Sequence, residues 1–154
     1  MGENIQRMCH RENILNISIQ TDCAGVDWQQ VSDTLREVGM AWHDPEVHRK
    51  AFENSHTTLF AYRGERLIGF GRAISDGAYQ AAVYDVAVVP EFQGQGIGRV
   101  IIGRILERLP HCNVILYAAP GREGFYEKLG FRRLKTGMAL FRNGAAARQK
   151  GITA

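Results

Sequence analysis

One segment constrains the fold of this chain more than any other, because an apolar run passes through three glycines straight into a second apolar run. The segment is VAVVPEFQGQGIGR, residues 86–99. Valine-rich runs are typical of buried strands. Isoleucine and leucine then recur at helical spacing over 97–109, until Pro110 ends the run. The sequence therefore predicts a buried strand, a tight glycine turn and a helix in direct succession.

The glycine turn at residues 93–98 suits an anionic ligand. Glycine adopts positive φ angles, and it places no side chain between the backbone and a ligand. The first amides of a helix have no acceptor inside the helix, and the helix dipole makes that end positive. Such a turn can hold a phosphate or pyrophosphate. From the glycines alone, a plain strand-to-helix turn without a ligand stays open as an alternative.

Several common ligand motifs are not met. The dinucleotide pattern GxGxxG fails because Arg99 stands in place of the third glycine, and Arg104-Ile105 replaces the Lys-Ser/Thr of a P-loop. The histidines show no HExxH spacing, and no GxSxG is present. The three cysteines are far apart without a CxxC pair, so we interpret them as reduced thiols and expect no metal site. They are Cys9, Cys23 and Cys112.

Alternation and capping signals divide the rest of the chain into elements. Asp27 can cap a helix with Gln30 completing a capping box, and Asp44-Pro45 marks a second helix start. The predicted strands are 13–20, 57–62, 67–74, 80–89, 114–118, 131–134 and 137–141, and the predicted helices are 27–38, 44–55, 97–109 and 121–129. The run 114–118 is apolar enough for the buried middle of a sheet. This order predicts an α/β fold, a mixed sheet with helices on both faces.

Length and composition indicate one domain. The 154 residues are 45% apolar and 23% charged, as in soluble globular proteins, so we expect a single domain over 1–154 with a core of about 13–141. Residues from about 143 to 154 are expected to form a flexible tail. The net charge of +3 suits a small anionic ligand but is too weak to indicate nucleic acid. No stretch has the length of a signal peptide core or a membrane span, so we expect a cytoplasmic protein without membrane contact.

Two motifs in the right order resemble one family. Gln93-x-x-Gly96-x-Gly98 resembles the Q/R-x-x-G-x-G/A signature of the GNAT superfamily of N-acetyltransferases, and Gly124 to Phe131 (GFYEKLGF) is similar to its FYEKLGF motif. The resemblance extends over roughly Leu59 to Phe141. It implies the acyl-CoA N-acyltransferase fold, a single domain with a mixed, mostly antiparallel central sheet flanked by helices. It also implies acetyl-CoA as the co-substrate, without a metal.

The resemblance assigns cofactor-binding residues. In the family the backbone amides of the glycine turn bind the pyrophosphate of coenzyme A, which implies Gln93, Gly94, Gln95, Gly96, Ile97, Gly98 and Arg99 here. The preceding strand pairs its backbone with the pantetheine arm, which implies Val86, Ala87 and Val88. Many relatives also contact the cofactor through an asparagine after the next strand. This chain has Ala118-Ala119-Pro120 at that place, so the contact is absent or made by backbone.

Two residues are implied as catalytic. Tyr126 matches the position that protonates the leaving thiolate in many relatives, and a phenol with a pKa near 10 is a suitable donor. The alternative is an aromatic side chain that packs against the cofactor. Asp85 is the acid on the strand before the glycine turn, where some relatives carry a base that acts directly or through water. Its alternative is a surface carboxylate that caps a loop, and water relays without a dedicated base are also common in the family.

The function implied is acetyl transfer from acetyl-CoA to a primary amine. The acceptor implied is a small amine of the arylalkylamine, polyamine or aminoglycoside type. Trp42 and His43 lie where the acceptor pocket of this family forms, although core packing and an exposed imidazole explain them equally well. The alternatives are a coenzyme A-binding sensor or partner module with weak catalysis, a protein amino-group acetyltransferase, and a nucleotide-binding regulator. Homodimers are frequent in the family, and no nucleic-acid partner is expected.

Overall fold

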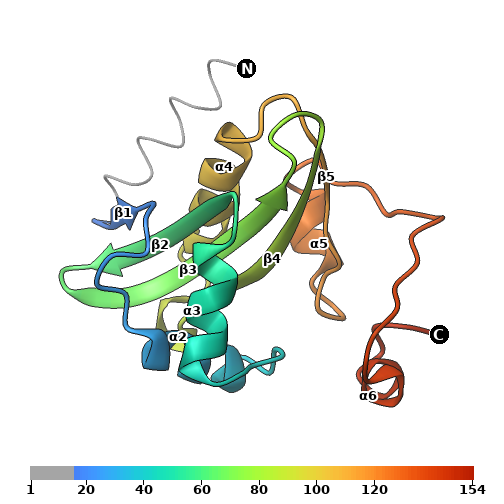
Figure 1. Ribbon diagram of the computed structural model, residues 1–154, viewed down its shortest axis with the longest axis horizontal. Coiled ribbons are helices and arrows are strands. Elements are labelled where there is room, and N and C mark those ends of the chain that lie inside the picture. Colours follow the sequence, from blue (N-terminus) through green and yellow to red (C-terminus); the bar gives the residue numbers. More distant parts are fainter. Residues whose placement is uncertain (1–15) are drawn as a thin grey trace. The chain divides into compact units, whose positions relative to one another are not determined.

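The computed structural model describes residues 16–154 and falls into two compact units, divided after Ile115 (Figure 1). Among the described residues, the first unit holds the sheet, three α-helices and one 3₁₀ turn, and the second holds two short α-helices. Cys9, His10 and the first residues of the strand predicted at 13–20 lie outside the described residues.

A five-stranded sheet forms the first unit. Its order is β1-β2-β3-β4-β5. The strands are β1 (Ser18–Gln20), β2 (Thr57–Arg63), β3 (Arg66–Ser75), β4 (Gln80–Val88) and β5 (Asn113–Ile115). The pairings from β1 to β4 are antiparallel and β5 joins β4 in parallel, so the predicted mixed, mostly antiparallel sheet is confirmed.

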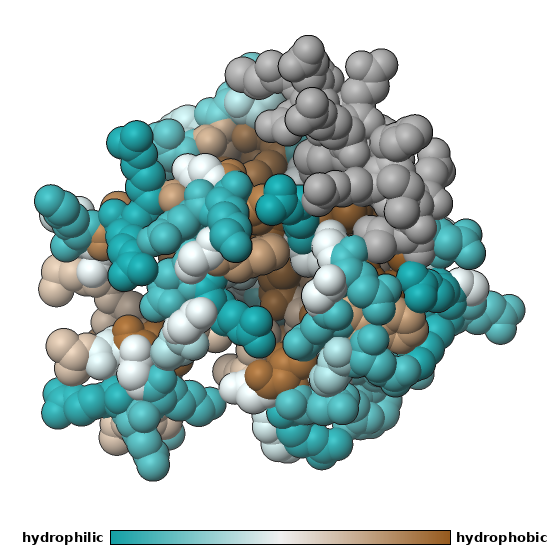
Figure 2. Space-filling model, turned by 180° about the vertical axis from the view of Figure 1, so that it is seen from behind, coloured by the Kyte–Doolittle hydropathy of each residue, from teal (hydrophilic) through white to brown (hydrophobic). Residues whose placement is uncertain are grey.

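Helices cover both faces of this sheet (Figure 1). They are α2 (Trp28–Glu37), α3 (Pro45–Glu53) and α4 (Ile97–Glu107). On one face Leu35 of α2 and Phe52 of α3 join Phe70 of β3 in a fully buried apolar cluster. Neighbouring residues of a strand point to opposite faces, so Gly69 and the glycine after Phe70 face α4. Figure 2 shows hydrophilic residues over most of the visible surface, with smaller apolar areas between them.

Two strand glycines set how closely α4 approaches the sheet. A Cβ atom on Gly71 would lie 3.0 Å from Ile105 Cδ1 and 3.1 Å from Ile101 Cγ2. On Gly69 it would lie 2.9 Å from Ile101 Cδ1. The missing side chains therefore let the helix lie directly against β3, which fixes where its first turn stands relative to the end of β4.

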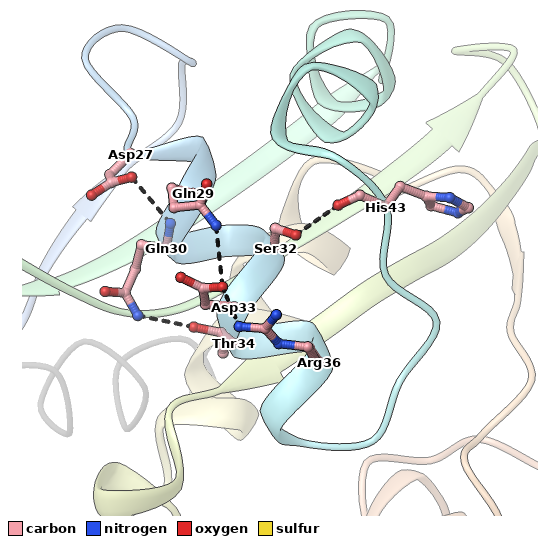
Figure 3. A network of polar contacts seen from close by, with 8 residues as sticks. All are labelled: Asp27, Gln29, Gln30, Ser32, Asp33, Thr34, Arg36 and His43. Atoms are coloured by element: carbon pink, nitrogen blue, oxygen red, sulfur yellow. Dashed lines mark hydrogen bonds and ion pairs between the residues drawn. The ribbon is translucent and has the colours of Figure 1, made fainter.

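The helix starts agree only in part with the predicted caps. Asp27 Oδ1 accepts from the Gln30 amide at 3.0 Å, which confirms the predicted cap (Figure 3). The second half of the capping box was wrong, because the Gln30 side chain donates to Thr34 Oγ1 instead. Asp44 stands at the N-cap of α3 without a side-chain capping bond, and Pro45 begins the helix by fixing its own φ.

The strand predicted at 114–118 forms only as β5, three residues at the sheet edge, and Ile115 is 53% exposed. The prediction of a fully covered central strand was therefore wrong. An apolar run does not by itself predict a central strand, because the strands that pair with it are set by residues far away in the sequence. Among the described helices, none has the length and apolar character needed to cross a membrane.

The second unit contains α5 (Glu123–Glu127) and α6 (Gly144–Gln149). The strands predicted at 131–134 and 137–141 are absent from the described residues, and Met138 and Leu140 are 98% and 88% exposed. Where we expected a flexible tail, α6 forms because the Asn143 side chain caps it by accepting from the Ala146 amide at 3.0 Å.

Candidate functional site

The strand, turn and helix predicted around residues 86–99 form as one continuous unit. β4 ends at Val88, a single 3₁₀ turn covers Pro90–Phe92, and α4 begins at Ile97. Gly94 and Gly96 have φ angles of 76° and 87°. A Cβ atom on either would meet no described atom within 4 Å, so the backbone conformation rather than crowding requires glycine there.

The start of α4 leaves its amides without side-chain partners. Gly96 is the N-cap, no side chain caps the helix, and no acidic residue lies in its first turn. The start of α2 differs, since the Asp27 carboxylate caps it. The first amides of α4 are therefore available to a ligand, and Arg99 adds positive charge in the same turn. This donor set fits a pyrophosphate and lies within the turn named from the sequence. The Gln93 amide is not part of it, because that amide donates to the Pro90 carbonyl at 3.2 Å.

The second half of β4 extends beyond its pairing with β5. β5 pairs only with Gln80–Ala82, whereas Ala87 and Val88 pair with β3 on the other side. The backbone groups of residues 83–88 that point away from β3 therefore have no β5 partner. Unpaired strand amides can accept an added strand-like ligand. The predicted pantetheine-contacting residues Val86, Ala87 and Val88 all lie on this part of β4. The Val88 carbonyl already accepts from Gln93 Nε2 at 3.0 Å, so the open groups lie before it.

A β-bulge interrupts β4 between its two halves. Phe70 pairs with Ala87 and Arg72 with Tyr84, so Gly71 faces two residues of β4, Asp85 and Val86. Asp85 has a φ angle of 54°, which is uncommon for any residue but glycine. Sequence reasoning placed Asp85 on the strand but missed the bulge, because alternation alone does not reveal one inserted residue.

Asp85 forms an ion pair with Arg72 that was not predicted from the sequence. Arg72 Nε lies 2.6 Å from Asp85 Oδ2, and the two side chains are 15% and 21% exposed. The guanidinium also donates to Ser55 Oγ at 3.3 Å and lies over the rings of Phe52 and Tyr84. Arg72 thus joins α3 to the bulge and occupies Oδ2 of Asp85. The signal was available, since Arg72 is the sole charge in the apolar run LIGFGRAI.

We expect the Arg72–Asp85 pair to stabilise the first unit measurably. Arg72→Met or Asp85→Asn alone should lower the free energy of unfolding by about 2–3 kcal/mol, because each leaves a mostly buried charge without its partner. The double variant should lose clearly less than the sum of the two. Urea unfolding of all four proteins measures the coupling. Additive losses would mean that the two side chains do not interact.

His48 of α3 is hydrogen-bonded to the loop between α2 and α3. Its side chain is 2% exposed, and its Nε2 accepts from the His43 amide at 2.9 Å. Ser32 Oγ of α2 donates to the His43 carbonyl at 2.6 Å (Figure 3). Trp42 beside it is 48% exposed, with the Arg36 guanidinium 5.3 Å from its ring centre. The core-packing alternative for Trp42 was therefore wrong.

Acid should weaken the fold through His48. Burial lowers its pKa below the ordinary 6.5, Asp85 raises it in opposition, and His43 and Arg72 lower it further. A lowered folded-state pKa means that the unfolded chain binds more protons, so stability is lost as the pH falls below about 6.5. Urea unfolding at pH 7.5 and 5.0 should show a smaller acid loss in His48→Gln than in the parent protein. Equal losses in the two would contradict this role.

Tyr126, the predicted acid, belongs to α5 in the second unit. Its ring makes edge contacts with Phe125 and Phe131, at centroid distances of 5.0 and 5.8 Å. Burial raises the pKa of its phenol above the ordinary 10.0. The hydroxyl therefore stays protonated at neutral pH, as a proton donor must. No group of three His, Cys, Asp or Glu side chains suited to a metal ion occurs within residues 16–154.

Comparison with known proteins identifies relatives that match most of the chain. Residues 26–147 match the family model described as acetyltransferase (GNAT) domain. The chain is 32% identical to serotonin N-acetyltransferase 2, chloroplastic, of Oryza sativa subsp. japonica, over 82% of this chain and 68% of that protein. It is 30% identical to the uncharacterized N-acetyltransferase ycf52 of Pyropia yezoensis, over 78% of this chain and 66% of that protein.

The fold has solved counterparts. A probable acetyltransferase of Staphylococcus aureus superposes with a TM-score of 0.73 at 26% identity, over 81% of this chain and 98% of that one. The sheet order, the glycine turn ahead of α4 and the matched residues 26–147 agree on one assignment. The chain therefore belongs to the GNAT acetyltransferase family.

Proposed function

We propose that the chain transfers an acetyl group from acetyl-CoA to a primary amine. The observation that carries this proposal is the uncapped start of α4, directly after the open half of β4. An uncapped helix start is a site for a pyrophosphate, and an open strand edge is a site for an amide-containing chain. Coenzyme A joins these two chemical parts in one molecule.

In this proposal the turn amides of residues 94–99 hold the pyrophosphate, since the Gln93 amide already donates to the Pro90 carbonyl. The positive charge of Arg99 adds to the helix dipole there. Val86, Ala87 and Val88 hold the pantetheine arm through their backbone groups, as an added strand would be held. The thioester then lies toward the bulge at Asp85, where the strand changes register.

The amine nitrogen attacks the thioester carbonyl carbon, so a C–N bond forms and the C–S bond breaks. The family resemblance assigns to Tyr126 the phenolic proton that the leaving sulfur takes, and burial raises the pKa of this phenol, so the hydroxyl is protonated when the reaction begins. The amine gives up one proton in the same reaction. Because Arg72 occupies Asp85 Oδ2, we assign this proton to water that Asp85 orients, rather than to the carboxylate directly.

We infer a small aromatic amine as the acceptor. The rice relative carries the name serotonin N-acetyltransferase, and it matches 82% of this chain. The exposed indole of Trp42 on the α2–α3 loop offers a flat apolar surface of the kind that an aromatic amine would contact.

The proposal is tested by release of free thiol from acetyl-CoA with four acceptors: tryptamine, spermidine, kanamycin and a lysine peptide. We expect turnover with tryptamine, with the acetylated amine identified by mass spectrometry. Turnover with the peptide alone would replace the small acceptor by a protein amino group. Tight coenzyme A binding without turnover of any amine would favour a coenzyme A-binding module instead.

A further inference from the structure

Both backbone polar groups of His43 are held by side chains from two different helices. Its carbonyl accepts from Ser32 Oγ of α2 at 2.6 Å, and its amide donates to His48 Nε2 of α3 at 2.9 Å. Ser32 is 3% and His48 2% exposed. We call this pair of bonds the His43 clamp. Both bonds are part-buried, and each ties the backbone of an exposed loop residue to a buried side chain, which holds that backbone more firmly than a bond between exposed groups would.

The clamp defines the chemical state of His48. To accept from the His43 amide, Nε2 must carry its lone pair, so the ring is neutral with its proton on Nδ1. A lone pair that is already engaged inside the protein does not take a proton from an amine. His48 is therefore a positioning residue and not a general base.

The clamp fixes the backbone beside two exposed side chains, those of Trp42 and His43. Trp42 is 48% exposed and the His43 side chain is exposed, although the His43 backbone is fixed. The Arg36 guanidinium lies 5.3 Å from the indole centre, so the ring also has a partner on α2. The held backbone and this ring contact restrict where the indole can lie, which lowers the ordering cost when a ligand arrives.

We propose that Ser32 and His48 are positioning residues for acceptor specificity, because their clamp on His43 holds Trp42 as one wall of the aromatic amine site. This inference rests on the proposed function for the identity of the ligand. It makes a separate claim about affinity. Tryptamine binding depends on the clamp, whereas coenzyme A binding does not.

The test compares His48→Leu, which cannot accept from the His43 amide, with His48→Gln, whose side-chain oxygen can. Ser32→Ala removes the other bond with little loss of volume. Tryptamine affinity is measured by calorimetry on the full chain saturated with coenzyme A, and KM and kcat are measured alongside. We expect His48→Leu and Ser32→Ala each to weaken tryptamine binding about tenfold, because each removes one of the two hydrogen bonds that hold the backbone beside Trp42. His48→Gln should stay within about threefold of the parent protein.

Three controls make the outcome specific. Coenzyme A affinity and kcat should stay within about twofold in all three variants, which a general loss of structure would not allow. Trp42→Ala should weaken tryptamine binding similarly, and adding His48→Leu to it should have little further effect, because both act through one wall. Spermidine, which has no ring, should bind Trp42→Ala and the parent protein alike.

The inference is overturned if tryptamine affinity is unchanged in His48→Leu and Ser32→Ala. It is equally overturned if these variants lose coenzyme A affinity together with tryptamine affinity. It is also overturned if the parent protein binds no tryptamine. Should His48→Leu fail to fold, Ser32→Ala and His48→Gln decide the same question. Failure of the proposed function would give a different result. Tryptamine binding would still weaken in the clamp variants, but no acetyl transfer would be seen, so the amine site would stand without the reaction.

Discussion

Gly96→Trp is expected to weaken coenzyme A binding by at least about a hundredfold. Gly96 is the N-cap of α4 with a φ angle of 87°, and a Cβ atom there would point into space free of described atoms. An indole in that space would stand where the pyrophosphate is expected. Calorimetry with coenzyme A measures the loss.

Backbone strain must be separated from obstruction in this variant. A non-glycine residue at such a φ costs roughly 1–2 kcal/mol. Gly25→Trp is a matched control, since Gly25 has a φ of 66° and equally open surroundings in the loop before α2. Both variants should lose similar stability in urea, but the control should keep its coenzyme A affinity. Undiminished binding by Gly96→Trp would place the pyrophosphate elsewhere.

Tyr126→Phe is expected to lower kcat by about 10²–10⁴-fold, the usual range for loss of a general acid, with little change in coenzyme A affinity. Phenylalanine keeps the edge contacts with Phe125 and Phe131 and removes only the hydroxyl. Steady-state rates with tryptamine, measured from pH 7 to 10, report both the loss and its pH dependence.

Tyr62→Phe serves as the comparison for Tyr126→Phe. Burial raises the pKa of Tyr62 as well, but this residue lies on β2 and packs against the apolar cluster of the first unit. Its removal should leave the rate unchanged. A Tyr126→Phe enzyme as fast as the parent protein at every pH would assign this residue to packing alone.

The sheet and the glycine turn were predictable because their signals are local. A valine-rich run, glycines that need positive φ and an isoleucine-rich helix specify each other over fourteen consecutive residues, 86–99. Asp27 was predictable for the same reason, since a cap acts on an amide only three residues away. The assignment of these residues to coenzyme A came from the family resemblance and stays a prediction.

The features that sequence reasoning missed depend on distant partners. The bulge at Asp85 exists because β4 carries one residue more than β3 at that point, and the register of two strands is not visible in either one. Arg72 and Asp85 are thirteen residues apart, and His43 is held by one residue on each of two helices. The short strands predicted at 131–134 and 137–141 failed for a related reason, because their apolar residues have no partner strand among the described residues.

The uncapped start of α4 also couples ligand occupancy to the melting temperature. A helix with a side-chain cap already has a protein acceptor for its first amides, whereas the first amides of α4 bond water until a ligand replaces it. A ligand at a hundred times its dissociation constant adds about 2.7 kcal/mol to the folded state. If acetyl-CoA binds there as proposed, the protein should withstand heat and proteolysis best when the ligand is bound, and its half-life should rise with the concentration of that ligand.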